Sequence, residues 1–187
     1  MIIGVLALQG AFIEHINTLK SLNIDCFEVR NKNDLNKKMD GIILPGGEST
    51  VISKLLRELD MFYLLKDKIE NGLPVFGTCA GMILLAKEIS NDSNVHLGTL
   101  NIKVKRNAYG RQTGSFYTIN RFADFDDVDM VFIRAPYIEE VGEGVEILSI
   151  VDSKIVAARY KNQLVTSFHP ELTKNTRVHE YFINMIK

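Results

Sequence analysis

The first half of the sequence alternates unbroken apolar runs with segments whose apolar residues recur at helical spacing. A run that is apolar at every position is typical of a strand buried on both faces of a parallel sheet. Strands that alternate with helices form βαβ units joined by right-handed crossovers. This pattern predicts strands at 2–8, 25–30, 41–44 and 73–76, and helices at 11–22, 34–39, 49–59, 61–69 and from 82 onward.

After Glu88 the pattern changes to short, partly alternating segments joined by turns. Such segments indicate strands, some of them antiparallel, that join or flank the parallel sheet. No repeat, low-complexity tract or linker divides the chain, so we expect a single domain over residues 1–187. The predicted fold is three-layer α/β, with an open, mostly parallel sheet, flanking helices and added antiparallel strands. The later strands are expected within 100–106, 114–121, 129–136, 145–151, 154–160 and 163–168, and a closing helix over 176–186.

The composition excludes several classes of protein. With 22 basic and 23 acidic residues the formal net charge is -1, which gives no electrostatic reason to expect nucleic acid or an anionic membrane as a partner. Cys26 and Cys79 lie far apart and offer neither a metal framework nor a disulfide scaffold, although one bridge between them is not forbidden. No apolar run approaches the roughly 18 residues of a membrane helix, and the N-terminal run lacks a basic leader. We therefore expect a soluble, cytoplasmic protein without a metal or cofactor.

The segment Gly77-Thr78-Cys79-Ala80-Gly81 lies where a predicted strand gives way to a helix, and it has the G-x-nucleophile-x-G form. The two glycines allow a sharp turn that leaves the central residue strained and exposed. The free amides of a helix N-terminus favour the thiolate form of a cysteine, and the amide of Ala80 would point to where an oxyanion forms. The alternative is that Cys79 is only a small buried thiol at a tight turn. We interpret Cys26, on its predicted strand, as a small buried thiol as well.

A cysteine nucleophile needs a base, and His169 is the histidine best placed to provide it. It follows a predicted strand in "SFHPEL", and Glu171 lies two residues further on. In extended backbone, residues two apart project to the same side, so this carboxylate can orient the imidazole. His15 and His179 look like solvated helix positions, and the loop residue His96 has no evident partner. The sequence therefore predicts a Cys79-His169-Glu171 triad.

A glycine-rich segment, "PGGEST", follows the third predicted strand. Gly46 and Gly47 let backbone approach a ligand closely, and a flexible peptide there can aim an N–H at an oxyanion. The alternative is a plain turn in which Ser49 or Thr50 caps the next helix, and both can be true at once. Ligands of open α/β sheets bind at the carboxyl ends of the strands, where "LQG", "PGGES", "GTCAG" and "FHPE" all fall.

Together these motifs resemble the class I glutamine amidotransferases and, within them, the glutaminase subunits of pyridoxal 5'-phosphate synthase. The resemblance runs from end to end and implies a flavodoxin-like α/β fold. Other class I glutaminases share the elbow and the "HPE" but not "RNAYGRQ", and several carry Gln where this chain has Ile83. Two mild departures are Tyr109, where the family often has Phe, and Tyr137, where it often has His. The motifs that carry the resemblance are, in order, "GVLALQG", "LPGGEST", "FGTCAGMILLAKEI", "RNAYGRQ", "FIRAP" and "SFHPELT".

The resemblance implies that Cys79 is the nucleophile, His169 the general base and acid, and Glu171 the residue that orients it. Gly47 and Ala80 would then form the oxyanion site. An arginine can fork onto the α-carboxylate of an amino acid, and a carboxylate can meet its α-ammonium group. The alternative is that Arg106 and Arg134 are cations on the surface or facing a partner protein. The residues implied to bind glutamine are Gly47, Glu48, Ser49, Arg106, Ile133 and Arg134.

The implied reaction is hydrolysis of L-glutamine to L-glutamate through a γ-glutamyl thioester, without a cofactor. The ammonia would pass through a channel to a separate synthase subunit, in an assembly that commonly has twelve copies of each subunit. Activity would be weak until that complex forms. Two other interpretations stay open. A cysteine hydrolase or peptidase on a related α/β fold would share the elbow, and a non-catalytic docking module would share only the fold.

Overall fold

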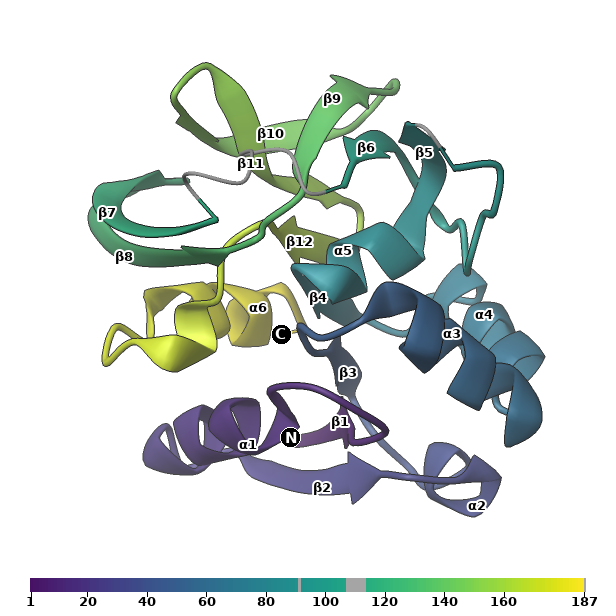
Figure 1. Ribbon diagram of the computed structural model, residues 1–187. Coiled ribbons are helices and arrows are strands. Elements are labelled where there is room, and N and C mark those ends of the chain that lie inside the picture. Colours follow the sequence, from purple (N-terminus) through teal and green to yellow (C-terminus); the bar gives the residue numbers. More distant parts are fainter. Residues whose placement is uncertain (91, 107–113, 187) are drawn as a thin grey trace.

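A computed structural model of the chain describes residues 1–90, 92–106 and 114–186 (Figure 1). One side of its main sheet is parallel, as the apolar runs predict. The strands there lie in the order β2 (Asp25–Val29), β1 (Ile2–Leu6), β3 (Gly41–Leu44), β4 (Val75–Thr78) and β12 (Gln163–Thr166).

The other side of the main sheet is mixed. Its strands continue in the order β11 (Lys154–Tyr160), β9 (Tyr137–Val141), β6 (Leu100–Lys105) and β5 (Ala86–Ser90), with β10 (Glu146–Val151) paired to β11. Antiparallel pairing joins β12 to β11, β11 to β9 and β9 to β6. A separate antiparallel pair is formed by β7 (Ser115–Phe122) and β8 (Phe125–Ile133). The predicted α/β fold class is confirmed.

Helices cover both faces of the sheet and give it three layers (Figure 1). In β3, Ile42 and Leu44 pack into one hydrophobic cluster, while Ile43 between them packs into the other. A strand that is apolar at every position thus serves both layers. The first cluster includes α3 (Ser49–Glu58), α4 (Phe62–Glu70) and α5 (Ala80–Leu85), and the second includes α1 (Phe12–Ser21) and α6 (Arg177–Ile186).

Several elements differ from the sequence prediction, among them β8, which lies at Phe125–Ile133 and not at 129–136. The helix expected at 34–39 is α2 (Lys32–Leu35), which begins earlier because the Asn31 side chain accepts a hydrogen bond from the amide of Asp34 and caps it. α5 ends at Leu85 and the chain passes directly into β5, a strand that we did not expect. The strand β9 was also missed, because its sequence "YIEEV" carries two adjacent glutamates.

The pairing of β9 with β6 explains why these glutamates are tolerated. Glu140 forms an ion pair with Lys103 of β6, and Glu139 forms one with Lys105. Cross-strand pairs of opposite charge stabilise a sheet, and only the folded neighbour supplies the lysines. None of the helices in the described part of the chain combines the length and the apolar character needed to cross a bilayer.

Candidate active site

The nucleophile elbow is present at the end of β4. Cys79 lies between the last residue of β4 and the first residue of α5, with φ 48° and ψ -97°, and its amide donates to the carbonyl of Thr166 at 2.8 Å. A non-glycine residue in such a conformation stores about 1–3 kcal/mol of strain. The flanking glycines are required by packing, because a Cβ on Gly81 would lie 2.1 Å from the carbonyl oxygen of Leu44.

The elbow differs from expectation in one respect. We expected an exposed cysteine, but Cys79 is only 8% exposed. It lines a pocket of about 600 Å³ and does not lie on an open surface.

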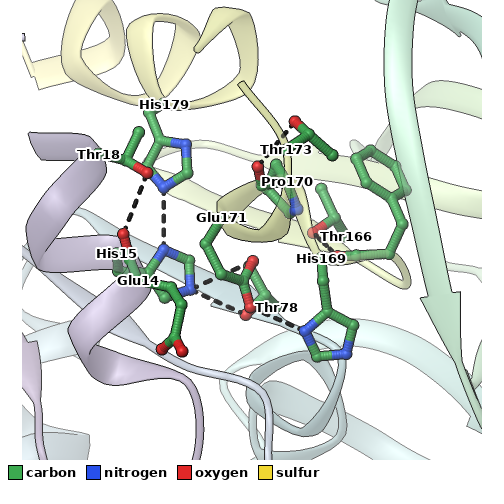
Figure 2. Close-up of polar contacts among 11 residues, drawn as sticks. Glu14, His15, Thr18, Thr78, Thr166, His169, Pro170, Glu171, Thr173 and His179 are labelled. Atoms are coloured by element: carbon green, nitrogen blue, oxygen red, sulfur yellow. Dashed lines mark hydrogen bonds and ion pairs between the residues drawn. The ribbon is translucent and has the colours of Figure 1, made fainter. Parts of the chain in front are cut away.

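His169 and Glu171 come together as predicted, although by a different backbone. The amide of His169 donates to the carbonyl of Val131 at 2.8 Å, and its Nδ1 lies 2.7 Å from Oε1 of Glu171. We expected extended backbone here, but Pro170 begins the short 3-10 helix η1 (Pro170–Leu172). This turn brings the carboxylate to the Nδ1 edge of the imidazole, and both side chains are buried (Figure 2).

The electrostatics of His169 are set by its two neighbours. Burial alone lowers the pKa of His169, but hydrogen bonds and charge interactions with Cys79 and Glu171 outweigh burial and raise the pKa to about 10. Because Nδ1 is engaged by Glu171, the other ring nitrogen, Nε2, is left for the thiol. A histidine with this pKa carries a proton at neutral pH. It can therefore protonate a leaving group formed at Cys79.

The glycine-rich turn is held against this pair. The carbonyl of Gly46 accepts a hydrogen bond from the amide of Ala11 at 3.0 Å, and the Gln9 side chain accepts one from the amide of Glu48 at 2.8 Å. A Cβ on Gly46 would lie 2.2 Å from Cε1 of His169. Gly46 is thus the residue that lets the turn touch the imidazole.

The helix that follows the turn is not capped as we had allowed. Glu48 is the N-cap of α3 and makes no side-chain cap hydrogen bond. Ser49 is the first helical residue, and its buried hydroxyl has no hydrogen-bond partner among the described residues. An unpaired buried hydroxyl beside a pocket is available to a ligand.

The pocket brings together most of the residues that the sequence singled out. Ala80 and Glu171 stay behind its wall, since neither is among the residues that line it. Gln9 was missed, although "LQG" was recognised as a strand end. Those that line the pocket are Gly47, Glu48, Ser49, Cys79, Arg106, Ile133, Arg134 and His169.

The two arginines reach the pocket in different ways. Arg106 is half-buried, and its Nη1 lies 3.0 Å from Oδ2 of Asp92, which fixes one end of the guanidinium. Arg134 is exposed and has a φ of 44°, and its amide donates to the carbonyl of Gly114. Tyr109 and the rest of 107–112 from the "RNAYGRQ" motif lie outside the described residues.

His15 and His179 are not solvated, contrary to our expectation. Both are fully buried, His15 on α1 and His179 on α6. Nδ1 of His15 lies 2.9 Å from Nε2 of His179, and Nε2 of His15 lies 3.2 Å from Oγ1 of Thr78 (Figure 2). The apolar spacing of the two helices could have revealed them, because His15 lies three residues after Phe12 and four before Leu19.

Comparisons with known proteins point the same way as this geometry. The model of the SNO glutamine amidotransferase family matches residues 5–187. The chain is 59% identical to pyridoxal 5'-phosphate synthase subunit PdxT of Desulfitobacterium hafniense (strain Y51), over 100% of this chain and 94% of that protein. It is 56% identical to the subunit of the same name from Streptococcus pneumoniae serotype 2 (strain D39 / NCTC 7466), over 100% and 98%.

A solved structure described as a glutamine amidotransferase is also similar. It superimposes with a TM-score of 0.93 at 45% sequence identity, covering 98% of each chain. Its fold and its sequence thus match together over nearly the whole length. This chain belongs to the SNO glutamine amidotransferase family.

Proposed function

We propose that this protein is the glutaminase subunit of a pyridoxal 5'-phosphate synthase and hydrolyses L-glutamine to L-glutamate and ammonia. One observation carries the proposal: a strained cysteine shares a pocket with a histidine whose other nitrogen is held by a buried glutamate. This is the arrangement of nucleophile, base and orienting group that acyl transfer requires. The names of the PdxT relatives support a place in pyridoxal 5'-phosphate synthesis, and the description of the family supports glutamine as the substrate.

The mechanism follows from the charges of the triad. The Cys79 thiolate attacks the side-chain amide carbon of glutamine, and the C–N bond breaks as imidazolium His169 gives its proton to the departing ammonia. This leaves a γ-glutamyl thioester and a neutral imidazole. His169 then takes a proton from water, the hydroxide attacks the thioester, and glutamate leaves as the thiolate and imidazolium are restored. Glu171 keeps the imidazolium oriented throughout.

The oxyanion of each tetrahedral intermediate would be held by the amides of Gly47 and Ala80. Because the carbonyl of Gly46 points to the amide of Ala11, the N–H of the same trans peptide, which belongs to Gly47, points the opposite way. A partner that reoriented this peptide would have to break the Ala11 hydrogen bond. We infer that docking of the synthase subunit switches activity through this peptide.

Substrate recognition would use the charged rim of the pocket. Arg106 and Arg134 can pair with the α-carboxylate of glutamine, and Glu48 can pair with its α-ammonium group. The unpaired hydroxyl of Ser49 offers a further polar contact, and Ile133 an apolar one. Ile133 is the last residue of β8, and the other four groups belong to residues that follow the carboxyl end of a strand.

Ammonia is useful to a synthase only while it is unprotonated, so it has to be passed on without meeting bulk water. We propose that it passes through a channel in the synthase subunit, in a complex of twelve copies of each subunit. In this proposal the chain is one domain and acts in the cytoplasm. No cofactor takes part in the glutaminase step.

The test is ammonia release from glutamine, measured with and without the cognate synthase subunit, for the wild-type protein and for Cys79→Ala. We expect release that requires both Cys79 and the partner. Strong release without the partner would keep the glutaminase and remove the switch. No release in any mixture would overturn the proposal, and hydrolysis of esters or peptides in its place would favour a different cysteine hydrolase.

A further inference from the structure

We propose that His15 is a positioning residue of this site, which anchors Glu171 through its Nε2–H while His179 fixes the tautomer that makes the anchor possible. The proposal rests on the proposed function for its kinetic consequences, but not for its geometry. The two histidines come from helices near opposite ends of the chain and meet behind the triad (Figure 2). They do not line the pocket.

The two carboxylate oxygens of Glu171, Oε1 and Oε2, differ in their contacts. Oε1 of this carboxylate is used by His169, whereas Oε2 is buried and makes no other hydrogen bond within the described part of the chain. A basic nitrogen, Nε2 of His15, lies 3.5 Å from Oε2, and both side chains are wholly buried. A buried carboxylate oxygen without a hydrogen-bond donor costs free energy. The contact with His15 therefore stabilises Glu171 in its observed position.

The protonation of the histidine pair is fixed by its surroundings. Burial lowers the pKa of His15 well below its usual range, and the charges of His179 and His169 add to this effect. Burial also lowers the pKa of His179 to about 4. Both rings are therefore neutral at pH 7, and each carries a single N–H. The titratable groups that face His15 are His179 from α6, Glu171 from η1 and His169 beyond it.

Two arrangements of the two protons keep the hydrogen bond between Nδ1 of His15 and Nε2 of His179. In the first, His179 donates from Nε2 to Nδ1 of His15, and His15 carries its proton on Nε2, facing Thr78 and Glu171. In the second, His15 donates to His179. The lone pair of Nε2 of His15 then faces a carboxylate, and the proton of His179 sits on Nδ1, which is buried and has no hydrogen-bond partner among the described residues.

The first arrangement has the lower electrostatic energy, because it aims an N–H at a negative oxygen and buries no unpaired donor. The hydrogen bonds then run in one direction, from His179 to His15 and from His15 to Oγ1 of Thr78, and the same Nε2–H of His15 faces Oε2 of Glu171 at 3.5 Å. Glu171 in turn accepts from Nδ1 of His169. In this way α1 and α6 determine the orientation of the imidazole that faces Cys79.

Kinetics of three variants separate positioning from packing. His15→Leu removes the donor, and we expect kcat for ammonia release in the complex to fall about 100-fold with KM nearly unchanged. His15→Gln keeps an N–H at the position of Nε2 and should recover most of this loss. Ile16→Val, a loss of packing on the same helix, should leave kcat at the wild-type value. Equal kcat for H15L and the wild type would overturn the proposal.

The role of His179 has its own kinetic test. His179→Leu should lower kcat when His15 is present, because the tautomer of His15 is then no longer imposed. The same substitution in the H15Q background should have no further effect, because an amide N–H needs no partner to direct it. Equal losses in the two backgrounds would mean that His179 acts through packing alone.

The tautomers can also be measured directly, without reference to activity. The method is NMR of protein labelled with 15N at histidine. We expect His15 and His179 both to carry their proton on Nε2 at pH 7. A proton on Nδ1 of His15 would overturn the proposal even if the enzyme is a glutaminase. The expected tautomers in a protein that releases no ammonia would instead overturn the proposed function and leave the anchoring of Glu171 in place.

Discussion

At the scale of single residues, the site combines a strained backbone with close contacts that only glycine permits. Cys79 is held at positive φ by the strand before it and the helix after it. Gly46 touches the imidazole of His169 where any side chain would collide with it. These features cost stability and serve geometry, a combination that is common at functional sites.

Replacing Gly46 by alanine tests the contact with His169. The added Cβ would lie 2.2 Å from Cε1 of His169, so the ring has to move away from Cys79. We expect Gly46→Ala to reduce kcat about 100-fold while the protein stays folded. Gly114→Ala is the matched control, because a Cβ there meets no described atom within 4 Å. Ammonia release at saturating glutamine measures both, and an active G46A would refute the contact.

The strain at Cys79 predicts that a residue which tolerates positive φ at this position makes the protein more stable. Glycine adopts positive φ without penalty, whereas alanine does not. Both Cys79→Gly and Cys79→Ala remove the thiol and should be inactive. We expect Cys79→Gly to be the more stable of the two by about 1–2 kcal/mol, measured as the free energy of unfolding in urea. Equal stabilities would show that the backbone is not strained.

At the scale of elements, two helices from opposite ends of the chain are joined by the buried pair His15–His179. Neutral buried histidines make a fold sensitive to acid. The unfolded chain binds protons at these positions below the ordinary histidine pKa of 6.5, and the folded chain does not. Stability from this source is therefore complete above about pH 6.5 and is lost as the pH falls toward 4.

His179 alone should contribute about 3 kcal/mol to this loss, from a pKa lowered to about 4. His169 adds little slope in the same window, because its raised pKa leaves it protonated in the folded state. We expect His179→Leu to flatten the dependence of the unfolding free energy on pH between 6.5 and 4. Chemical denaturation at several pH values measures it, and an unchanged slope would contradict the assignment.

The elements also differ in how far the sequence could predict them. The unbroken run of β3 was predicted with the bounds Gly41–Leu44, because burial on both faces leaves a clear pattern. β9 was missed because its two glutamates are neutralised by lysines of β6, which the local sequence does not reveal. The bend into β5 after Leu85 was likewise missed, since "MILLA" continues as a helix as readily as it ends.

At the scale of the whole molecule, short motifs predicted the triad Cys79-His169-Glu171, whereas the two histidines that lie behind it were not predicted. Cys79, His169 and Glu171 lie in short patterns whose chemistry can be read locally. The pairing of His15 with His179 depends on how α1 and α6 pack, and neighbouring glutamates made both positions look solvated. That the chain forms one domain, and that it works in a complex with a synthase subunit, stay predictions.

The proposed function depends above all on attack of Cys79 on the side-chain amide carbon of glutamine. The most direct measurement is labelling of the protein, in complex with the synthase subunit, by 6-diazo-5-oxo-L-norleucine, followed by peptide mass mapping. Both cysteines are free, so Cys26 is a control within the same molecule. We predict one adduct, on Cys79, blocked by glutamine and accompanied by loss of ammonia release. An adduct on Cys26, or none on Cys79 in a complex that releases ammonia, would contradict the account.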